Sequence, residues 1–208
     1  MNNEILRNLS YGVYVVTTND DIKPTGCIVN SIMQVSKDTL ALSVNHINYT
    51  NECIKKCRKF AISILSQDTD ENIIPIFGFQ TGRDINKCEN IETININGLN
   101  VIKNSIGYII CEIIDCLETD SHTLFLARIL DGDIIQKNKI PMTYAYYHQV
   151  KKGLSPKTAP TYIEEKVTDE LAYKCSICGY IYKGDITKEP DSYICPICKK
   201  PKSVFIKV

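Results

Sequence analysis

Short runs of β-branched and aromatic residues, separated by polar turns, occupy the first two thirds of the chain. Such runs are typical of strands. Two long runs, at 108–120 and 122–135, are so close together that they predict a hairpin, and Asn97-Gly98 and Asp131-Gly132 are further turn signals. Other strands are expected at 11–18, 27–36, 39–44 and 59–66. Because no long helices alternate with these runs, the pattern predicts a mainly β fold, a barrel rather than a doubly wound sheet.

Two short helices are expected to interrupt the strands. Thr50 or Asn51 can N-cap a helix that runs to about Lys59, with Cys53 and Cys57, one helical turn apart, on its inner face. The second helix covers 70–78, where Pro75 indicates a short or kinked element.

The composition changes after Tyr147, where prolines, glycine and charges replace large apolar residues. The predicted division is a barrel at 1–150, a linker at 151–171 and a small domain at 172–208. The chain has 24 basic and 24 acidic residues, but the last 37 residues hold seven lysines and three acidic residues. The other 171 residues hold 17 basic and 21 acidic ones, so the two parts carry opposite net charges. The overall balance gives no sign of nucleic-acid binding.

Ten cysteines stand in a chain whose start shows no signal-peptide pattern and which has no apolar run of membrane-spanning length. Metal binding or free thiols are therefore expected rather than disulfides, in a cytoplasmic protein. Two Cys-x-x-Cys pairs, sixteen residues apart, predict one tetrahedral site with Cys175, Cys178, Cys195 and Cys198 as ligands. This ligand set suits zinc and iron equally, and the metal must help to fold so small a domain.

The surrounding sequence, "YKCSICGYIY" followed by "CPICKKPKSVF", resembles the rubredoxin family of mononuclear iron electron carriers. The resemblance implies that the four cysteines hold iron. Tyr193 stands at the usual tryptophan position, and Lys199 at a usual glycine, where positive φ would be costly for lysine.

No G-x-G-x-x-G or Walker A motif occurs, so a Rossmann nucleotide site is not expected. The segment "NHINYT" instead leads into a helix N-terminus, where free N–H groups favour an anion.

Six segments, "LSYGVYVVTT", "GCIVNSIMQVS", "NHINYT", "FGFQTGRDINK", "SHTLFLARILDGD" and "PMTYAYYH", follow the order of the flavin reductase-like family over about residues 5–148. The resemblance implies an FMN-binding split barrel that forms a homodimer. It places Asn30 and Ser31 beside the flavin ring, and Asn48 and Thr50 at the FMN phosphate. The remaining implied positions are Gly26, Cys27, Ile28 and Val29 on the wall, Arg83 and Lys87 near the phosphate, Tyr147 near the flavin or the dimer interface, and His122 as the catalytic candidate.

Each position also has a purely structural interpretation. Asn30 can simply end a strand, Arg83 and Lys87 can be solvated loop charges, His122 can be structural, and the tyrosines at 144–147 can be packing.

A flavin domain joined to a Cys₄ iron domain converts hydride transfer into one-electron transfer. The resulting hypothesis is that NAD(P)H or an upstream reductase reduces FMN, FMN reduces the iron, and the iron reduces an acidic acceptor such as a flavodiiron oxygen or nitric oxide reductase. Two alternatives stay open. One is an NAD(P)H:flavin reductase that supplies a monooxygenase and has a structural zinc tail, and the other is a non-enzymatic flavin- or metal-binding regulatory module.

Overall fold

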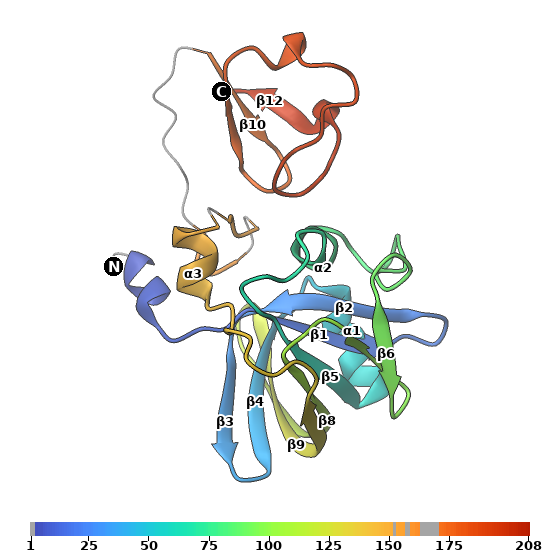
Figure 1. Ribbon diagram of the computed structural model, residues 1–208. Coiled ribbons are helices and arrows are strands. Elements are labelled where there is room, and N and C mark those ends of the chain that lie inside the picture. Colours follow the sequence, from blue (N-terminus) through green and yellow to red (C-terminus); the bar gives the residue numbers. More distant parts are fainter. Residues whose placement is uncertain (1–2, 152, 157–158, 163–170) are drawn as a thin grey trace.

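A computed structural model describes residues 3–151, 153–156, 159–162 and 171–208. A seven-stranded antiparallel sheet forms the barrel, with the strand order β2-β1-β5-β8-β9-β4-β3 (Figure 1). Its strands, in chain order, are β1 (Tyr14–Asn19), β2 (Pro24–Val29), β3 (Ile32–Ser36), β4 (Thr39–Asn45), β5 (Lys59–Ile64), β8 (Gly107–Glu118) and β9 (His122–Ile134). Their inward side chains, among them Val16, Phe60 and Phe125, are fully buried and form the main core.

The smaller elements surround this sheet. They are the helices α1 (Tyr49–Cys57), α2 (Ile73–Phe79) and α3 (Tyr144–Gln149), the 3₁₀ turns η1 (Asn3–Asn8), η2 (Ile186–Lys188) and η3 (Lys202–Val204), the hairpin β6 (Thr93–Ile96) with β7 (Leu99–Ile102), and the small sheet β11 (Ile181–Lys183), β10 (Ala172–Cys175) and β12 (Phe205–Lys207). No helix in the described residues is long and apolar enough to cross a membrane.

The predicted hairpin at 108–120 and 122–135 is confirmed as β8 and β9. Asn97-Gly98 is also confirmed as a turn, because both residues have positive φ between β6 and β7. Asp131-Gly132 does not form a turn. It lies inside β9, where the register passes from Asp131 to Ile129 and leaves Leu130 as an extra residue. The glycine signal there marks a β-bulge.

The prediction of one strand over 27–36 is wrong. The strand ends at Val29, and β3 begins at Ile32 on the opposite edge of the sheet. Asn30 and Ser31 are poor strand formers, so the chain leaves the sheet there and crosses to its other edge. We call these two residues the β2–β3 joint.

The first helix starts earlier than predicted, with Asn48 as its N-cap, and ends at Cys57 before Lys59 opens β5. Asn51 is not the cap because its side chain donates to Val44 O inside the barrel. The second helix is confirmed as α2, with Pro75 inside it. Helix α3 was not predicted, although Thr143 caps it by accepting from Tyr146 N.

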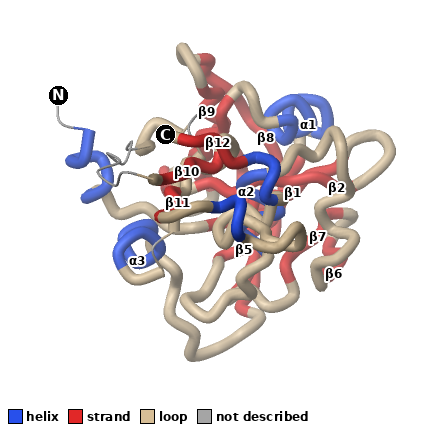
Figure 2. The backbone as a smooth tube through the Cα atoms, turned by 90° about the horizontal axis from the view of Figure 1, so that it is seen from above, coloured by secondary structure: helices blue, strands red, loops and turns tan. Residues whose placement is uncertain are grey.

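The small C-terminal sheet belongs to a separate lobe that stands over one end of the barrel. In Figure 1 this lobe lies above α2, and in Figure 2, viewed from above, β10, β11 and β12 overlie the α2 region. We call residues 171–208 the Cys₄ lobe.

Candidate functional site

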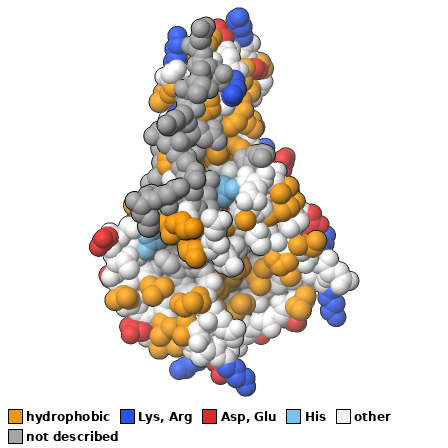
Figure 3. Space-filling model, turned by 90° about the vertical axis from the view of Figure 1, so that its left-hand side faces the viewer, with side chains coloured by type: hydrophobic (Ala, Val, Ile, Leu, Met, Phe, Trp, Pro, Cys, Tyr) orange, Lys and Arg blue, Asp and Glu red, His pale blue; other side chains and the backbone are white. Residues whose placement is uncertain are grey.

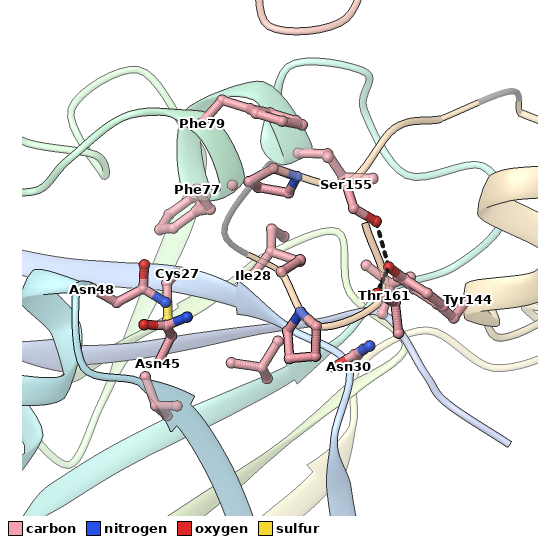
Figure 4. A pocket seen from close by; sticks show the side chains of 18 of the residues that line it. Cys27, Ile28, Asn30, Asn45, Asn48, Phe77, Phe79, Tyr144, Ser155 and Thr161 are labelled. Atoms are coloured by element: carbon pink, nitrogen blue, oxygen red, sulfur yellow. Dashed lines mark hydrogen bonds between the residues drawn. The ribbon is translucent and has the colours of Figure 1, made fainter. Parts of the chain in front are cut away.

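A pocket opens at the end of the barrel beneath the Cys₄ lobe (Figure 4). Its walls come from 27–30 at the end of β2, from β4, from α2 and α3, and from residues 154–156 and 159–161. We call this the main pocket. Phe77, Phe79 and Ile28 give it apolar surface, whereas Asn30 and Asn45 give it amide groups. A mainly apolar hollow with a few amide groups suits a flat, partly polar organic ligand.

A side pocket continues the main pocket toward the start of α1. The two share Cys27, Asn48, Gly78, Phe79 and Pro156, so they form one continuous cleft. Their volumes are about 150 Å³ and 270 Å³. Together these fall within the roughly 300–1,000 Å³ of small-molecule sites.

Asn48 stands where the two pockets meet. It N-caps α1 with extended backbone, yet its side chain makes no capping hydrogen bond. The side chain therefore remains available to the cleft, next to helix N–H groups that attract anions. Thr50, in the first turn of the same helix, lines the side pocket and is almost fully buried.

Lys87 is a buried cation in the wall of the side pocket. Only 3% of it is exposed, and its Nζ donates to Gly26 O at 2.8 Å and to Phe77 O at 3.1 Å. Burial lowers the pKa of Lys87 to about 8. The side chain thus joins β2 to α2 and places positive charge beside an anion site.

We expect the Lys87→Met variant to change the pH dependence of stability. The folded pKa of about 8 lies below the ordinary 10.5, so the unfolded chain holds this proton to higher pH. The free energy of unfolding of the ligand-free protein should therefore rise between pH 8 and 10.5, by up to about 3 kcal/mol from this group. Urea unfolding should show that Lys87→Met removes the rise and that Lys103→Met, at an exposed surface pair, retains it. Equal slopes in all three proteins would contradict the assignment.

Three predicted residues do not line either pocket. Gly26 lies behind the wall, where an added Cβ would come within 2.6 Å of Val16 O, and its carbonyl accepts from Lys87. The Ser31 hydroxyl donates to Asn30 Oδ1 at 3.2 Å. Arg83 stacks on Tyr49, 4.5 Å from the ring centre, and pairs with Glu52 outside the cleft, although neighbouring Thr81 and Gly82 line the side pocket.

His122 lies in the wall of the main pocket at the start of β9. Its Nδ1 is 2.8 Å from Ser121 Oγ. Partial burial, and secondarily the charge of His46, lower the pKa of His122 below its ordinary value. The ring is therefore mainly neutral at pH 7. In this state one ring nitrogen carries a proton that it can donate, and the other can accept one.

Residues 154–156 and 159–161, which we call the C-terminal segment of the wall, cover one side of the main pocket and are held by hydrogen bonds between hydroxyl groups. Tyr144 Oη hydrogen-bonds to Ser155 Oγ and to Thr161 Oγ1, and all three residues are buried (Figure 4). Tyr147 Oη donates to Leu154 O at 3.1 Å. These contacts make residues C-terminal to the barrel part of the pocket wall.

The Tyr144→Phe variant should loosen this wall. It deprives two buried hydroxyl groups of a partner, which should lower the free energy of unfolding by about 1–3 kcal/mol. Limited proteolysis should then cleave near 153–162 faster. The control Tyr108→Phe removes one part-buried bond, to Asp131, and Tyr108 packs on a different hydrophobic cluster from Tyr144. Unchanged cleavage in Tyr144→Phe would show that the tyrosine does not hold the segment.

The four predicted metal ligands come together in the Cys₄ lobe. Their sulfur atoms lie within 4.8 Å of one another, with Cys175 to Cys198 and Cys178 to Cys195 at 3.6 Å. A tetrahedral ion about 2.3 Å from each sulfur requires sulfur separations of about 3.8 Å, whereas a disulfide needs about 2.05 Å. The donor set therefore fits one tetrahedral ion.

The two Cys-x-x-Cys turns, which we call the knuckles, present backbone groups in the same way. Gly179 N donates to Cys175 O and Lys199 N to Cys195 O, both at 2.9 Å. Gly179 has a φ of 84° and Lys199 a φ of 57°. Lys199 thus adopts the left-handed conformation anticipated from the sequence, without the glycine that relieves its strain. Tyr193 packs edge-on against Phe205 and Tyr182 beside the cluster.

Comparisons with known proteins match both parts of the chain. Residues 6–155 match the model of the flavin reductase like domain, and residues 173–206 match that of the rubrerythrin, rubredoxin-like domain. The chain belongs to the flavin reductase-like family. It carries a C-terminal rubredoxin-like domain as well.

Relatives support this assignment over the whole length. The chain is 31% identical to the high molecular weight rubredoxin of Moorella thermoacetica, with 100% of both chains covered. It is 29% identical to the ferric-chelate reductase (NAD(P)H) of Archaeoglobus fulgidus, covering 80% of this chain and 100% of that protein. The NADH:FAD oxidoreductase SgcE6 of Streptomyces globisporus shares the fold, with a TM-score of 0.62 and 19% identity over 67% of this chain and 84% of that one.

The cleft fits the flavin that this family binds. It offers amide groups beside an apolar wall for a ring system, and a helix N-terminus with a buried lysine nearby for a phosphate. Cys27, Ile28, Val29, Asn30, Asn48, Thr50, Lys87, His122 and Tyr147 all line it.

Several lining residues were not predicted. They include Asn45, Phe77, Phe79, Tyr144, Ser155 and Thr161. The tyrosines at 144–147 and the proline-containing stretch after Tyr147 stand out in the sequence, but nothing local shows that they meet in one pocket wall. The fold of the barrel brings them together.

Proposed function

We propose that this protein transfers electrons from NAD(P)H or an upstream reductase, through FMN, to an Fe(Cys)₄ centre and on to a separate acceptor. One observation supports this more than any other. Phe79 both lines the flavin-binding cleft and packs against the four cysteines, so the two cofactor sites share a side chain. Bound FMN would exchange hydride and single electrons, and a four-thiolate iron would carry one electron. The test is an anaerobic reductive titration, in which iron and flavin should be reduced together.

The residues of the cleft have distinct proposed roles. Asn48 and Thr50 bind the phosphate, and the charges of Lys87 and Arg83 favour it. Asn30 and Ser31, with the chain from Gly26 to Val29, orient the ring. His122 and Tyr147 face the reacting edge, with neutral His122 positioned to hold or pass a proton.

We infer a homodimer from exposed apolar side chains on the barrel. On β3 Met33 and Val35 are 62% and 51% exposed, and on β8 Leu117 is 61% exposed. Figure 3 views the β3 side of the molecule and shows hydrophobic side chains spread over the barrel there. Apolar exposure of this kind marks a partner surface. The free cysteines agree with a cytoplasmic protein.

The proposed acceptor is an acidic redox protein, such as a flavodiiron oxygen or nitric oxide reductase. The lysines of the Cys₄ lobe support this proposal: of the seven, Lys174 is buried and Lys199 pairs with Glu71, and the other five provide positive charge for an acceptor. Reduction of such an acceptor should slow by about tenfold or more when ionic strength rises from 10 to 300 mM, because salt screens steering. Stopped-flow absorbance would measure the rate. A flat profile would contradict electrostatic steering.

A second function is favoured by the barrel alone. The Archaeoglobus relative, named as a ferric-chelate reductase, is matched over its full length by only 80% of this chain. Direct reduction of a free flavin or a ferric chelate at the cleft is therefore a rival activity. A variant that lacks the metal ligands separates the two. Full activity toward these small acceptors, with no iron-dependent transfer in the native protein, would favour the rival and a structural zinc tail.

A further inference from the structure

The Cys₄ lobe contacts the barrel at the rim of the cleft. Phe79, the last residue of α2, packs on the cysteine cluster, and Ile177, between the first two cysteines, lines the side pocket. Figure 4 shows Phe79 at the upper edge of the pocket, beneath the chain of the lobe. A barrel side chain thus reaches the cysteine cluster, and a side chain of the lobe reaches the cleft.

Two further contacts involve the knuckles themselves. Lys199 Nζ lies 3.9 Å from Glu71 Oε1, just before α2. Next to Cys178, an added Cβ at Gly179 would come within 3.0 Å of Tyr162 Oη. One face of the lobe, which we call the knuckle face and define by Ile177, Gly179 and Lys199, is therefore turned toward the barrel and its C-terminal extension.

Burial agrees with this orientation. All four cysteines are 0% exposed, and Phe79 is one of the side chains that pack on them. The opposite net charges of the two parts of the chain also favour the contact.

We propose that the knuckle face docks on the barrel of its own chain, with Phe79 as the positioning residue between flavin and iron, and that electrons enter the iron through this contact. The proposal rests on the proposed function and specifies its route. The two-electron-reduced flavin gives up its electrons one at a time. They go either to two ferric centres or twice to the same centre, which the acceptor oxidises between the two transfers. The flavin releases two protons to solvent. An external acceptor must then use another face of the lobe or displace the barrel.

Chemical crosslinking tests the docking without any electron transfer. A carbodiimide, which joins carboxylates to amines without a spacer, should link Glu71 to Lys199, and peptide mass spectrometry should find the product. Glu71→Gln should abolish it, whereas Glu92→Gln, at a surface pair with Lys103, should leave it unchanged. In a refolded mixture of ¹⁴N- and ¹⁵N-labelled protein, both peptides of each crosslink should carry the same isotope. Mixed-isotope crosslinks, or none, would overturn the proposal.

Charge reversal gives a second test, on residues outside the cleft lining. Glu71→Lys should lower the rate of iron reduction by the flavin about tenfold, because small displacements of reacting groups have effects of this size or greater. Adding Lys199→Glu should restore the rate and the contact. Flavin content, iron content and the rate of flavin reduction serve as controls and should not change. A double variant as slow as Glu71→Lys would contradict the proposed pairing.

Phe79→Leu tests the positioning role in the same assay. We expect slower flavin-to-iron transfer with unchanged iron content and a weaker Glu71–Lys199 crosslink. Unchanged transfer would exclude Phe79 from the route. Fast iron reduction without the crosslink would refute docking in this geometry and leave the proposed function standing. A crosslink without iron reduction would support the docking and refute the proposed function.

Discussion

The Cys195→Ser variant is expected to lose the metal and to unfold the Cys₄ lobe, while the barrel keeps its fold and its flavin. The lobe has only strands of three or four residues, and its buried core contains the four cysteines themselves. Metal–thiolate bonding in such small domains contributes on the order of 10 kcal/mol to folding. No set of side chains of this size can replace that contribution.

Metal analysis, together with amide NMR spectra of variant and parent, measures this loss. Resonances of residues 171–208 should collapse toward unfolded positions, and barrel resonances should persist except around Phe79 and Glu71. Cys116→Ser is the matched control, since Cys116 is exposed and outside the cluster. A folded lobe in the metal-free variant would show that the site does not hold this part of the chain together.

Asn48→Asp should have opposite effects on stability and on flavin affinity. Asp is as good an N-cap as Asn, and its charge suits the N-terminus of α1, so the flavin-free protein should unfold at the same or slightly higher denaturant concentration. The added carboxylate, however, lies where a phosphate dianion is proposed to bind. Repulsion there should weaken FMN binding by roughly 100-fold or more.

Fluorescence titration with FMN measures the flavin affinity, and urea unfolding without FMN measures the stability. Asn72→Asp is a matched control because Asn72 caps α2 without a side-chain bond and lies outside both pockets. It should leave FMN affinity unchanged. If Asn48→Asp binds FMN as well as the parent does, the phosphate lies elsewhere.

The parts of the fold that could be predicted are those with a local signal. The β8–β9 hairpin follows from two long apolar runs, and the cysteine cluster follows from ligand spacing. Asn97-Gly98 was correctly predicted as a turn, but Asp131-Gly132 forms a bulge. The two dipeptides carry the same local signal, and only pairing with β8 distinguishes them.

The cleft could be predicted only in part, since its walls come from segments more than 100 residues apart. Cys27 and Asn48 were predicted from family order. Phe79, Tyr144 and Thr161 were not, because their place in the wall depends on how α2, α3 and the segment beyond the barrel pack. The break at the β2–β3 joint was missed although Asn30 and Ser31 interrupt the apolar run there. What no local signal shows is that the chain crosses to the opposite edge of the sheet, because that depends on how the strands pair.

The most direct test is an anaerobic reductive titration of the full chain, with its metal content measured first. Absorbance at flavin and iron–thiolate wavelengths is followed as NADH, NADPH or, failing both, dithionite is added in small steps. The account predicts one iron per chain, and an iron signal that bleaches together with the flavin and returns when an oxidised acceptor is added. Zinc in the site, or iron that stays ferric while the flavin is fully reduced, would contradict it and favour the flavin reductase or the non-enzymatic regulatory module.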